Sequence, residues 1–219
     1  MILVFYKQSI HYIHKTFKAL FGVNDTHEYV RKLNLNMWHK LAHPVLLKTG
    51  IYTIFHYENK IIRDALNLIK HKKDEDVANI LCCVVKDVLL EELSQYAIFS
   101  DFENPIITGV PPHRDQYRKR GFNPSSLIAE KLGAHFNIEY IPNLLVFIRD
   151  TKAQKTLARK SRFENMRFSM NIKHKYSQKI LNRPIIVIDD VTTTGATLSE
   201  ARRALKKHTS RIICIALAH

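Results

Sequence analysis

The sequence predicts an α/β protein with an open parallel β-sheet, flanking helices and a helical N-terminal extension. From residue 105 onward, short apolar runs alternate with helical patterns, an order that is typical of βα units and a parallel sheet. The clearest of these runs, Pro184–Ile188, has four β-branched residues in succession, as expected for a strand buried on both faces. The chain has 219 residues, enough to form the hydrophobic core of one domain with an extension.

We expect residues 1–50 to form the helical extension and residues 51–219 to form the main domain. Residues 8–22 place apolar side chains on one helical face and basic or histidine side chains on the other, so an amphipathic helix is predicted there. The favoured interpretation is that its apolar face docks on the main domain. The alternative is a helix that lies on acidic lipid or on nucleic acid.

The first half of the main domain is predicted to hold one strand and two helices. Apolar residues alternate roughly over residues 51–57, which indicates the strand. A helix is expected from about Asn59, and a second helix is expected after Asp74, whose carboxylate can cap its first turn. Cys82 and Cys83 fall on the second helix, where they are expected to pack rather than to react.

The second half continues as alternating strands, loops and helices. Asn123 is expected to cap a helix that has Pro124 at its first position and turns Leu127, Ile128 and Leu132 inward. The other predicted elements are a buried strand at 105–110, a basic loop at 111–122, an extended segment at 140–148, a basic and partly helical segment at 149–167, a helix at 197–207 and a last strand at 211–218.

The net charge of the chain indicates which kind of ligand or partner it binds. Lys and Arg together number 34 against 20 Asp and Glu, so the formal net charge is +14, which favours an anionic ligand or partner. The three cysteines are too few and too poorly spaced for a disulfide framework or a cysteine zinc site. The sequence shows no signal peptide and no apolar stretch of the roughly 20 residues that a transmembrane helix needs. A soluble cytoplasmic protein is therefore expected.

The most informative segment runs from Ile185 to Thr197. Asp189 and Asp190 follow the buried strand, at the edge where open α/β sheets bind ligands. Residues 192–197 then form a threonine- and glycine-rich loop that leads into a helix, and such a loop can bind a phosphate through its backbone N–H groups. Two adjacent carboxylates suit ribose hydroxyls or a hydrated Mg²⁺. The residues alone therefore predict a sugar-phosphate site.

This segment resembles the 5-phosphoribosyl-1-pyrophosphate (PRPP) motif of type I phosphoribosyltransferases, with an apolar strand, two acids and a threonine-glycine loop. Three further stretches resemble the ComF/GntX family, a competence-associated group with a phosphoribosyltransferase-like domain. They are residues 51–70, residues 117–123 and the run from Arg149 through Leu157 and Arg162 to Asn165. Together these matches cover about residues 51–219, and they imply the open-sheet fold of the type I enzymes.

The sequence departs from the ComF pattern in two places. Members of the family usually begin with a small Cys-x-x-Cys zinc module, whereas residues 1–50 contain no cysteine. The loop after the first core strand usually reads Val-Pro-Val-Pro, whereas this chain has Val110, Pro111, Pro112 and His113 there. The second departure falls where a type I enzyme holds pyrophosphate.

The resemblance implies a role for each matched residue. Asp189 and Asp190 would be the catalytic acid pair, which holds the ribose hydroxyls and, through water, Mg²⁺. The 5-phosphate would be bound by Thr192, Thr193, Thr194, Gly195, Ala196 and Thr197. The pyrophosphate loop and the flexible loop that closes over the site would be formed by Pro112, His113, Arg114, Arg118, Arg120, Arg149, Lys152, Gln154 and Lys155.

Two functions follow from these assignments. In the first, the chain binds PRPP and Mg²⁺, and a nitrogen nucleophile displaces pyrophosphate from the ribose C1 atom. Thr193 stands where hypoxanthine-guanine phosphoribosyltransferases carry an Asp, so the sequence gives little support to 6-oxopurine salvage and does not identify the acceptor.

In the second function, the chain is a noncatalytic competence protein that binds single-stranded DNA and a helicase partner. Residues 117–122 mix basic and aromatic side chains, which suits either the PRPP pocket or single-stranded nucleic acid.

Overall fold

The computed structural model describes residues 26–95, 103–149 and 166–219 of the chain. The predicted amphipathic helix at residues 8–22 lies outside these described residues, and so do Lys152, Gln154 and Lys155 of the predicted flexible loop. None of the described helices has the length and the apolar character that a membrane crossing requires.

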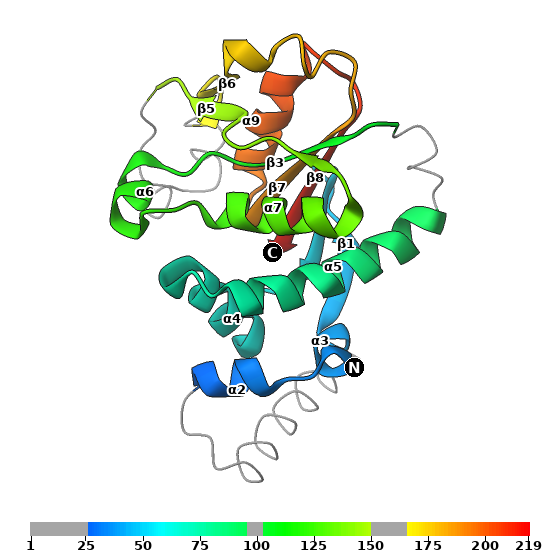
Figure 1. The fold of residues 1–219 in the computed structure, drawn as a ribbon, viewed down its shortest axis with the longest axis vertical. Helices are drawn as coiled ribbons and strands as arrows, with labels where there is room; N and C mark the ends of the chain where they lie inside the picture. Colours follow the sequence, from blue (N-terminus) through cyan, green and yellow to red (C-terminus); the bar gives the residue numbers. More distant parts are fainter. Residues whose placement is uncertain (1–25, 96–102, 150–165) are drawn as a thin grey trace.

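A six-stranded sheet forms the centre of the fold (Figure 1). Its strands follow the order β1-β2-β8-β7-β3-β4, and only the β1–β2 pair at one edge is antiparallel. The bounds of these strands are β1 Ala42–Leu46, β2 Ile51–Phe55, β3 Ile106–Gly109, β4 Glu139–Tyr140, β7 Ile185–Val191 and β8 Ile212–Ala218. The predicted α/β class with a mostly parallel sheet is therefore confirmed.

Helices flank this sheet, as predicted. In chain order they are α2 Thr26–Lys32, α3 Leu35–His39, α4 Lys60–Lys72, α5 Glu75–Gln95, α6 Arg114–Arg120, α7 Pro124–Phe136 and α9 Ala196–Leu205, with a short 3₁₀ helix at His174–Tyr176. Figure 1 shows α9 on one side of the sheet and α4, α5 and α7 on the other. A separate antiparallel ribbon packs on the α9 side and consists of β5 (Leu145–Phe147) and β6 (Met170–Ile172).

Successive side chains of each strand point to opposite faces of the sheet, so a separate hydrophobic cluster forms on each face. Along β7, Ile186 and Ile188 belong to the cluster that also contains buried residues of α2 to α5 and α7. Ile185 and Val187 of the same strand belong to the other cluster, which includes buried residues of α9, β5 and β6. The central strand is thus buried on both faces, as its run of β-branched residues predicted.

Two helices begin where the sequence signals predicted. The Asn123 side chain accepts a hydrogen bond from the backbone N–H of Ser125 at 3.2 Å, and Pro124 occupies the first turn of α7. The Asp74 carboxylate accepts a hydrogen bond from the backbone N–H of Val77 at 3.1 Å, at the start of α5. In both places a short polar side chain satisfies a backbone donor that the helix itself leaves unpaired.

The predicted loop at residues 111–122 is wrong in its middle part, which forms α6. Asp115 lies in the first turn of this helix and Arg118–Arg120 in its last turn, and both placements are favourable to the helix dipole. Gly121, with φ of +74°, ends the helix and donates its backbone N–H to the carbonyl of Tyr117 at 2.8 Å. Prolines before this short helix and a glycine after it make the whole stretch resemble a loop in sequence.

The N-terminal segment is continuous with the main sheet and core. Residues 26–39 are largely helical, as expected, but residues 42–46 form β1 and pair with β2. Trp38 is fully buried in the same cluster as the apolar residues of α4 and α5. A proline and a histidine within β1 obscure the strand signal, and an edge strand tolerates both. The sheet and its core therefore extend across the predicted boundary at residue 50.

One close approach fixes the position of α7 over the sheet. A Cβ atom on Gly109, the last residue of β3, would lie 2.6 Å from backbone atoms of Ser125 and Ser126. Only glycine leaves room for the N-terminus of α7 to pack this tightly on β3. The approach brings Ser125 to the edge of the sheet where β3 and β7 both end.

Replacing Gly109 with alanine is therefore expected to push α7 away from β3. We expect Gly109→Ala to lower the free energy of unfolding by about 1–3 kcal/mol, because the added methyl group overpacks a backbone contact. Urea unfolding followed by circular dichroism measures this change. An unfolding midpoint equal to that of the wild type would show that the contact between β3 and α7 is not tight.

Candidate functional site

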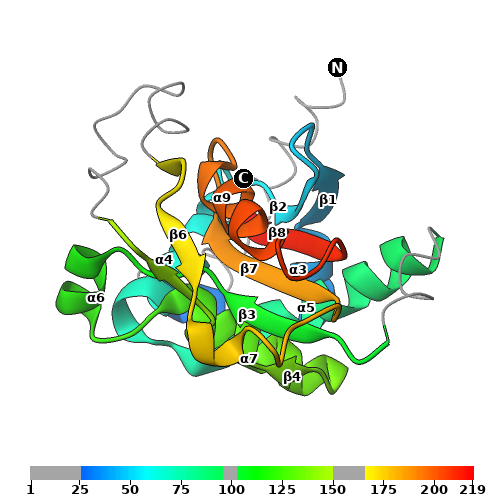
Figure 2. The ribbon, with the colours of Figure 1, turned by 90° about the horizontal axis from the view of Figure 1, so that it is seen from above.

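The acid pair lies at the carboxyl end of the central strand. Asp189 and Asp190 are among the last three residues of β7, which runs between β8 and β3 (Figure 2). After β7, the backbone N–H of Thr192 donates to the carbonyl of Ala218 at 2.9 Å, so the loop begins against the end of β8. Because parallel strands bring their carboxyl ends to one edge, the segments that follow β3, β7 and β8 meet here.

Asp189 carries a buried carboxylate, with only 7% of the residue exposed. Its Oδ1 atom accepts hydrogen bonds from the Ser125 hydroxyl at 3.2 Å and from the backbone N–H of Asp190 at 2.9 Å. Burial raises the pKa of Asp189 well above its ordinary value, the neighbouring Asp190 carboxylate raises it further, and Lys70 opposes both effects. A desolvated acid at the ligand-binding edge of a sheet is typical of a functional site.

Asp190 is paired with a lysine from a distant part of the chain. The Lys70 Nζ atom lies 3.1 Å from Asp190 Oδ2, and 15% of each side chain is exposed. Lys70 lies in the last turn of α4, where a cation also interacts favourably with the helix dipole. The centre of the Tyr57 ring is 5.9 Å from the same ammonium group, within range of a cation–π interaction.

Sequence reasoning gave no role to Lys70 or Ser125. Lys70 is the last residue of the stretch at 51–70 that resembles the ComF family. That match is the sequence signal that could have assigned it a role. Ser125 had no comparable signal, because a serine in the first turn of a helix is common for local reasons alone. Both residues come from helices of the same layer, and only the packing of that layer on the sheet brings them to the end of β7.

The predicted phosphate loop is held in shape by its own threonines. The Thr192 hydroxyl accepts a hydrogen bond from the backbone N–H of Gly195 at 3.1 Å, and the Thr194 hydroxyl accepts one from Ala196 at 3.3 Å. Gly195 caps α9 with φ of +78°, and a Cβ atom there would lie 2.7 Å from Ile51 Cδ1, so this position requires glycine. The loop therefore presents the N-terminus of a ten-residue helix directly after the acid pair.

A contact between α9 and the β1–β2 turn supports the loop from outside. The Arg202 guanidinium donates to the carbonyl of Thr49 at 2.8 Å and also to the carbonyl of Gly50. These hydrogen bonds tie the turn to the helix that follows the phosphate loop. The sequence did not indicate this contact, because its partners are more than 150 positions apart.

The predicted pyrophosphate loop lies where β3 ends. Pro112 and His113 follow that strand, and the His113 ring centre is 5.5 Å from that of Phe147 at the end of β5. The Arg149 guanidinium donates to the backbone carbonyl of Arg167. The ring contact brings the end of β5 close to the segment that follows β3.

The predicted arginines of the same region lie on α6. Arg114, Arg118 and Arg120 belong to a helix that has no buried residue and stands at the side of the sheet (Figure 2). Among the described residues, no ion pair joins these arginines to the acid pair. The structure thus brings together Asp189, Asp190 and the phosphate loop, whereas the arginines remain on an adjacent exposed surface.

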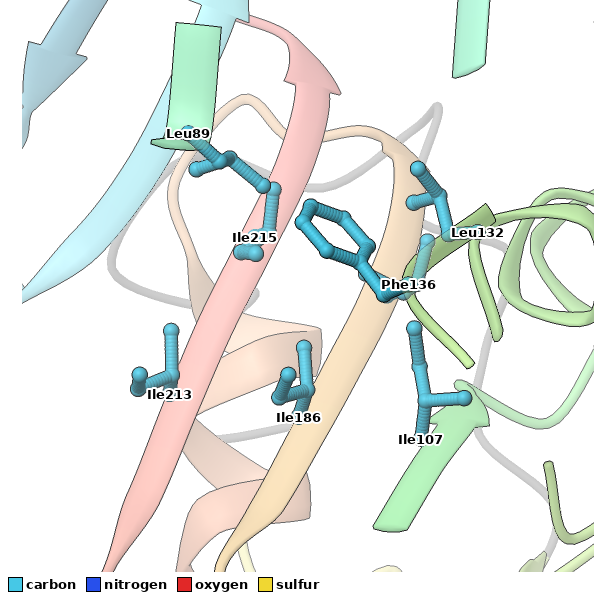
Figure 3. Close-up of a pocket in the computed structure, with 8 residues that line it drawn as sticks. Leu89, Ile107, Leu132, Phe136, Ile186, Ile213 and Ile215 are labelled. Carbon is cyan, nitrogen blue, oxygen red and sulfur yellow. The ribbon is translucent and has the colours of Figure 1, made fainter. Parts of the chain in front are cut away.

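An apolar pocket lies within the helix layer that also supplies Lys70 and Ser125, and its lining distinguishes it from this site. It lies between α5, α7 and the sheet, on the face opposite α9 (Figure 3). Every lining side chain is apolar, and they are Leu89, Ile107, Leu132, Phe136, Ile186, Ile188, Ile213 and Ile215. A sugar phosphate needs hydrogen-bonding partners, so this pocket does not suit that ligand.

The acid pair suits a metal ion only in combination with other ligands. Within the described residues, no group of three or more His, Cys, Asp or Glu side chains is arranged to hold a metal ion. Asp189 and Asp190 offer two carboxylates, and proteins often hold Mg²⁺ with one or two carboxylates together with substrate phosphates and water. The pair therefore fits a Mg²⁺ ion that arrives with a phosphate ligand better than a resident ion.

Comparison with curated proteins supports the resemblance to ComF. No family model matches the chain. The chain is 29% identical over 103 residues to competence protein F of Haemophilus influenzae, which covers 46% of this chain and 44% of that protein. It is 26% identical over 102 residues to DNA utilization protein YhgH of Escherichia coli, which covers 47% of this chain and 43% of that protein. The chain thus spans under half the length of these relatives, and the predicted resemblance to ComF-like proteins is confirmed.

Two solved structures are distantly similar to this one. Orotate phosphoribosyltransferase of Mycobacterium tuberculosis is 9% identical with a TM-score of 0.36, covering 88% of this chain and 83% of that chain. Orotate phosphoribosyltransferase of Aeropyrum pernix is 14% identical with a TM-score of 0.32, covering 86% of this chain and 79% of that chain.

Removing the charge of Asp189 is expected to stabilise the fold. Because the pKa of Asp189 is raised, the folded protein binds this proton more tightly than the unfolded chain. The free energy of unfolding therefore falls as the pH rises above about 4, where the carboxyl ionises in the unfolded chain, and keeps falling up to the raised pKa of the folded protein. Asparagine keeps the shape and an acceptor for the Ser125 hydroxyl. We expect Asp189→Asn to raise the free energy of unfolding by about 1–2 kcal/mol near neutral pH and to have little effect at about pH 4.

Urea unfolding of the two proteins across this pH range measures the difference. Asp64→Asn is the matched control, because Asp64 forms an ion pair with Lys60 on α4, away from β7, and its loss removes the same charge. An Asp189→Asn variant that is less stable than the wild type at neutral pH would contradict the presence of a desolvated charge at this position.

Proposed function

We propose that the chain is a ComF-like protein whose phosphoribosyltransferase-type site binds PRPP together with Mg²⁺. One observation carries this proposal: a buried Asp189 and a half-buried Asp190 are followed within a few residues by a glycine-capped helix N-terminus. The hydroxyls of a ribose phosphate can donate hydrogen bonds to the two carboxylates, and its phosphate dianion can bind at the N-terminus of the helix. One ligand therefore contacts both features.

We assign the 5-phosphate to the loop at 192–197. Hydrogen bonds from the backbone N–H groups of Gly195 and Ala196 to threonine hydroxyls already hold the loop in shape. A phosphate that takes these N–H groups would replace the threonine hydroxyls as their acceptor. The dipole of α9 favours an anion at this end of the helix. The contact between Arg202 and the β1–β2 turn keeps the helix in place.

We assign the ribose hydroxyls to the acid pair. Burial raises the pKa of Asp189, so ionising its carboxyl reduces the stability of the fold, and hydroxyl groups that donate to the carboxylate would offset part of that penalty. Ser125 and the Asp190 backbone already hold one oxygen of Asp189, so the carboxylate is oriented before the ligand arrives. A preoriented acceptor of this kind gives selectivity for a ligand with a diol.

In the proposed transfer, the bond between ribose C1 and the pyrophosphate oxygen breaks and a bond from C1 to an acceptor nitrogen forms. Bound Mg²⁺ would neutralise the charge of the leaving pyrophosphate. The acid pair would hold the ribose and stabilise the positive charge that develops at C1. Arg114, Arg118 and Arg120 on α6 and Arg149 beyond β5 are the cations we assign to the pyrophosphate side.

Calorimetric titration of PRPP with Mg²⁺ tests the proposal. We expect saturable binding by the wild type and an affinity lower by about 100-fold or more in the Asp189→Asn/Asp190→Asn double variant, because several charged hydrogen bonds are lost. Asp64→Asn/Asp87→Asn is the matched control, since Asp64 pairs with Lys60 on α4 and the Asp87 carboxylate lies 3.1 Å from His39 Nε2, both outside the site. No heat of binding from a wild-type sample shown to be folded would refute the proposal.

A second candidate function is the binding of single-stranded nucleic acid, and the exposure of α6 favours it. Tyr117 is 50% exposed and lies on this helix among Arg114, Arg118, Lys119 and Arg120. An exposed ring flanked by cations can stack on a base while the cations neutralise phosphates. The relatives named for competence and for DNA utilization are consistent with this candidate.

Fluorescence anisotropy with a labelled single-stranded oligonucleotide separates the two candidates. If α6 binds DNA, we expect affinity to fall steeply with salt and Tyr117→Ala to weaken it by about tenfold or more, because a stacked base is lost. Asp189→Asn should leave this affinity unchanged. Lys206→Ala/Lys207→Ala, directly after α9, tests whether a loss of positive charge elsewhere weakens binding to the same extent. No binding by the wild type at low salt would exclude the second candidate.

A further inference from the structure

Lys70 forms an ion pair with the second residue of the acid pair. Its Nζ atom lies 3.1 Å from Asp190 Oδ2, and only 15% of either side chain is exposed. The lysine is positioned by a packed helix, because its neighbours Leu66, Leu68 and Ile69 on α4 are buried in the core. The ammonium group is therefore a built part of the site and differs from the weak ion pairs of an exposed surface.

A bare divalent ion would have to compete with partners that the protein already supplies. Asp190 Oδ2 pairs with Lys70, and Asp190 Oδ1 accepts the backbone N–H of Val191 at 2.8 Å. Asp189 Oδ1 accepts hydrogen bonds from Ser125 and from the backbone of Asp190. A hard cation requires several oxygen ligands with uncompensated charge, and this pair offers few without an added phosphate.

We propose that Lys70 is a positioning residue that keeps divalent metal off the acid pair until PRPP brings its own phosphates. The inference rests on the proposed function, because it assigns the missing metal ligands to PRPP. When the Mg²⁺ complex of PRPP binds, its pyrophosphate offers the ammonium group a second anion, and Asp190 becomes available to the hydrated ion. The Tyr57 ring, 5.9 Å from Nζ, favours a cation in this region throughout the exchange. Metal and substrate therefore bind as one unit.

Binding of Mn²⁺ in the absence of PRPP tests this inference. Electron paramagnetic resonance measures the free ion, so the bound fraction follows by difference. Four proteins are compared: the wild type, Lys70→Met, Lys70→Arg and Lys72→Met. Methionine keeps the apolar stem of lysine and removes its charge, whereas arginine keeps the charge. Lys72 is exposed on the same helix, so its variant controls for net charge.

We expect Lys70→Met to bind Mn²⁺ at least about tenfold more tightly than the wild type, because a cation close to the metal position is gone. Lys70→Arg and Lys72→Met should bind Mn²⁺ as the wild type does. Adding Asp190→Asn to Lys70→Met should abolish the gain. If circular dichroism shows that Lys70→Met does not fold, Lys70→Gln takes its place with the same expected result.

Equal Mn²⁺ affinity of the wild type and Lys70→Met would overturn the inference, and so would an equal gain in Lys72→Met. A negative result for the role of Lys70 can be distinguished from a negative result for PRPP binding, because the Mn²⁺ measurement contains no PRPP. A wild type that binds PRPP, combined with a Lys70→Met variant that gains no metal, would retain the proposed site and remove this role from Lys70.

Discussion

Two carboxylates in succession at the end of one buried strand impose an electrostatic constraint on which the candidate site depends. Desolvation and mutual repulsion both oppose the charged form of Asp189, so the pair needs compensation from its surroundings. Lys70 supplies an ion pair to Asp190, and Ser125 supplies a hydrogen bond to Asp189. These partners belong to α4 and α7, so the site forms only when both helices are packed on the sheet.

The same constraint accounts for the arrangement of the surrounding elements. Gly109 lets α7 approach β3 closely enough for Ser125 to reach Asp189. Gly195 turns the chain directly from the loop after the acid pair into α9, and Arg202 ties that helix to the β1–β2 turn. The acid pair, with Asp189 buried and Asp190 half-buried, and a helix N-terminus are thus held at one edge of the sheet by contacts on both of its faces. This is the rigid support that a small charged ligand requires.

Local signals predicted the parts of the site that lie within one stretch of sequence. The apolar run before Asp189 predicted β7, and the threonine-glycine loop predicted the start of α9. Local signals failed where elements are short or irregular, as in the seven-residue helix α6 and the proline-containing edge strand β1. They could not assign Lys70 or Ser125, because the roles of these residues arise from tertiary packing across tens of positions in the chain.

The central claim is that the acid pair at the end of β7 receives the hydroxyls of a ribose phosphate. The most direct measurement is a carbon-13 NMR titration of the aspartate carboxyl groups with ribose 5-phosphate, which has the diol and the 5-phosphate but no pyrophosphate. The account predicts saturable shifts for Asp189 and Asp190 and constant signals for Asp64 and Asp87, which lie on α4 and α5. Constant signals from Asp189 and Asp190, or equal shifts across all four carboxyl groups, would contradict it.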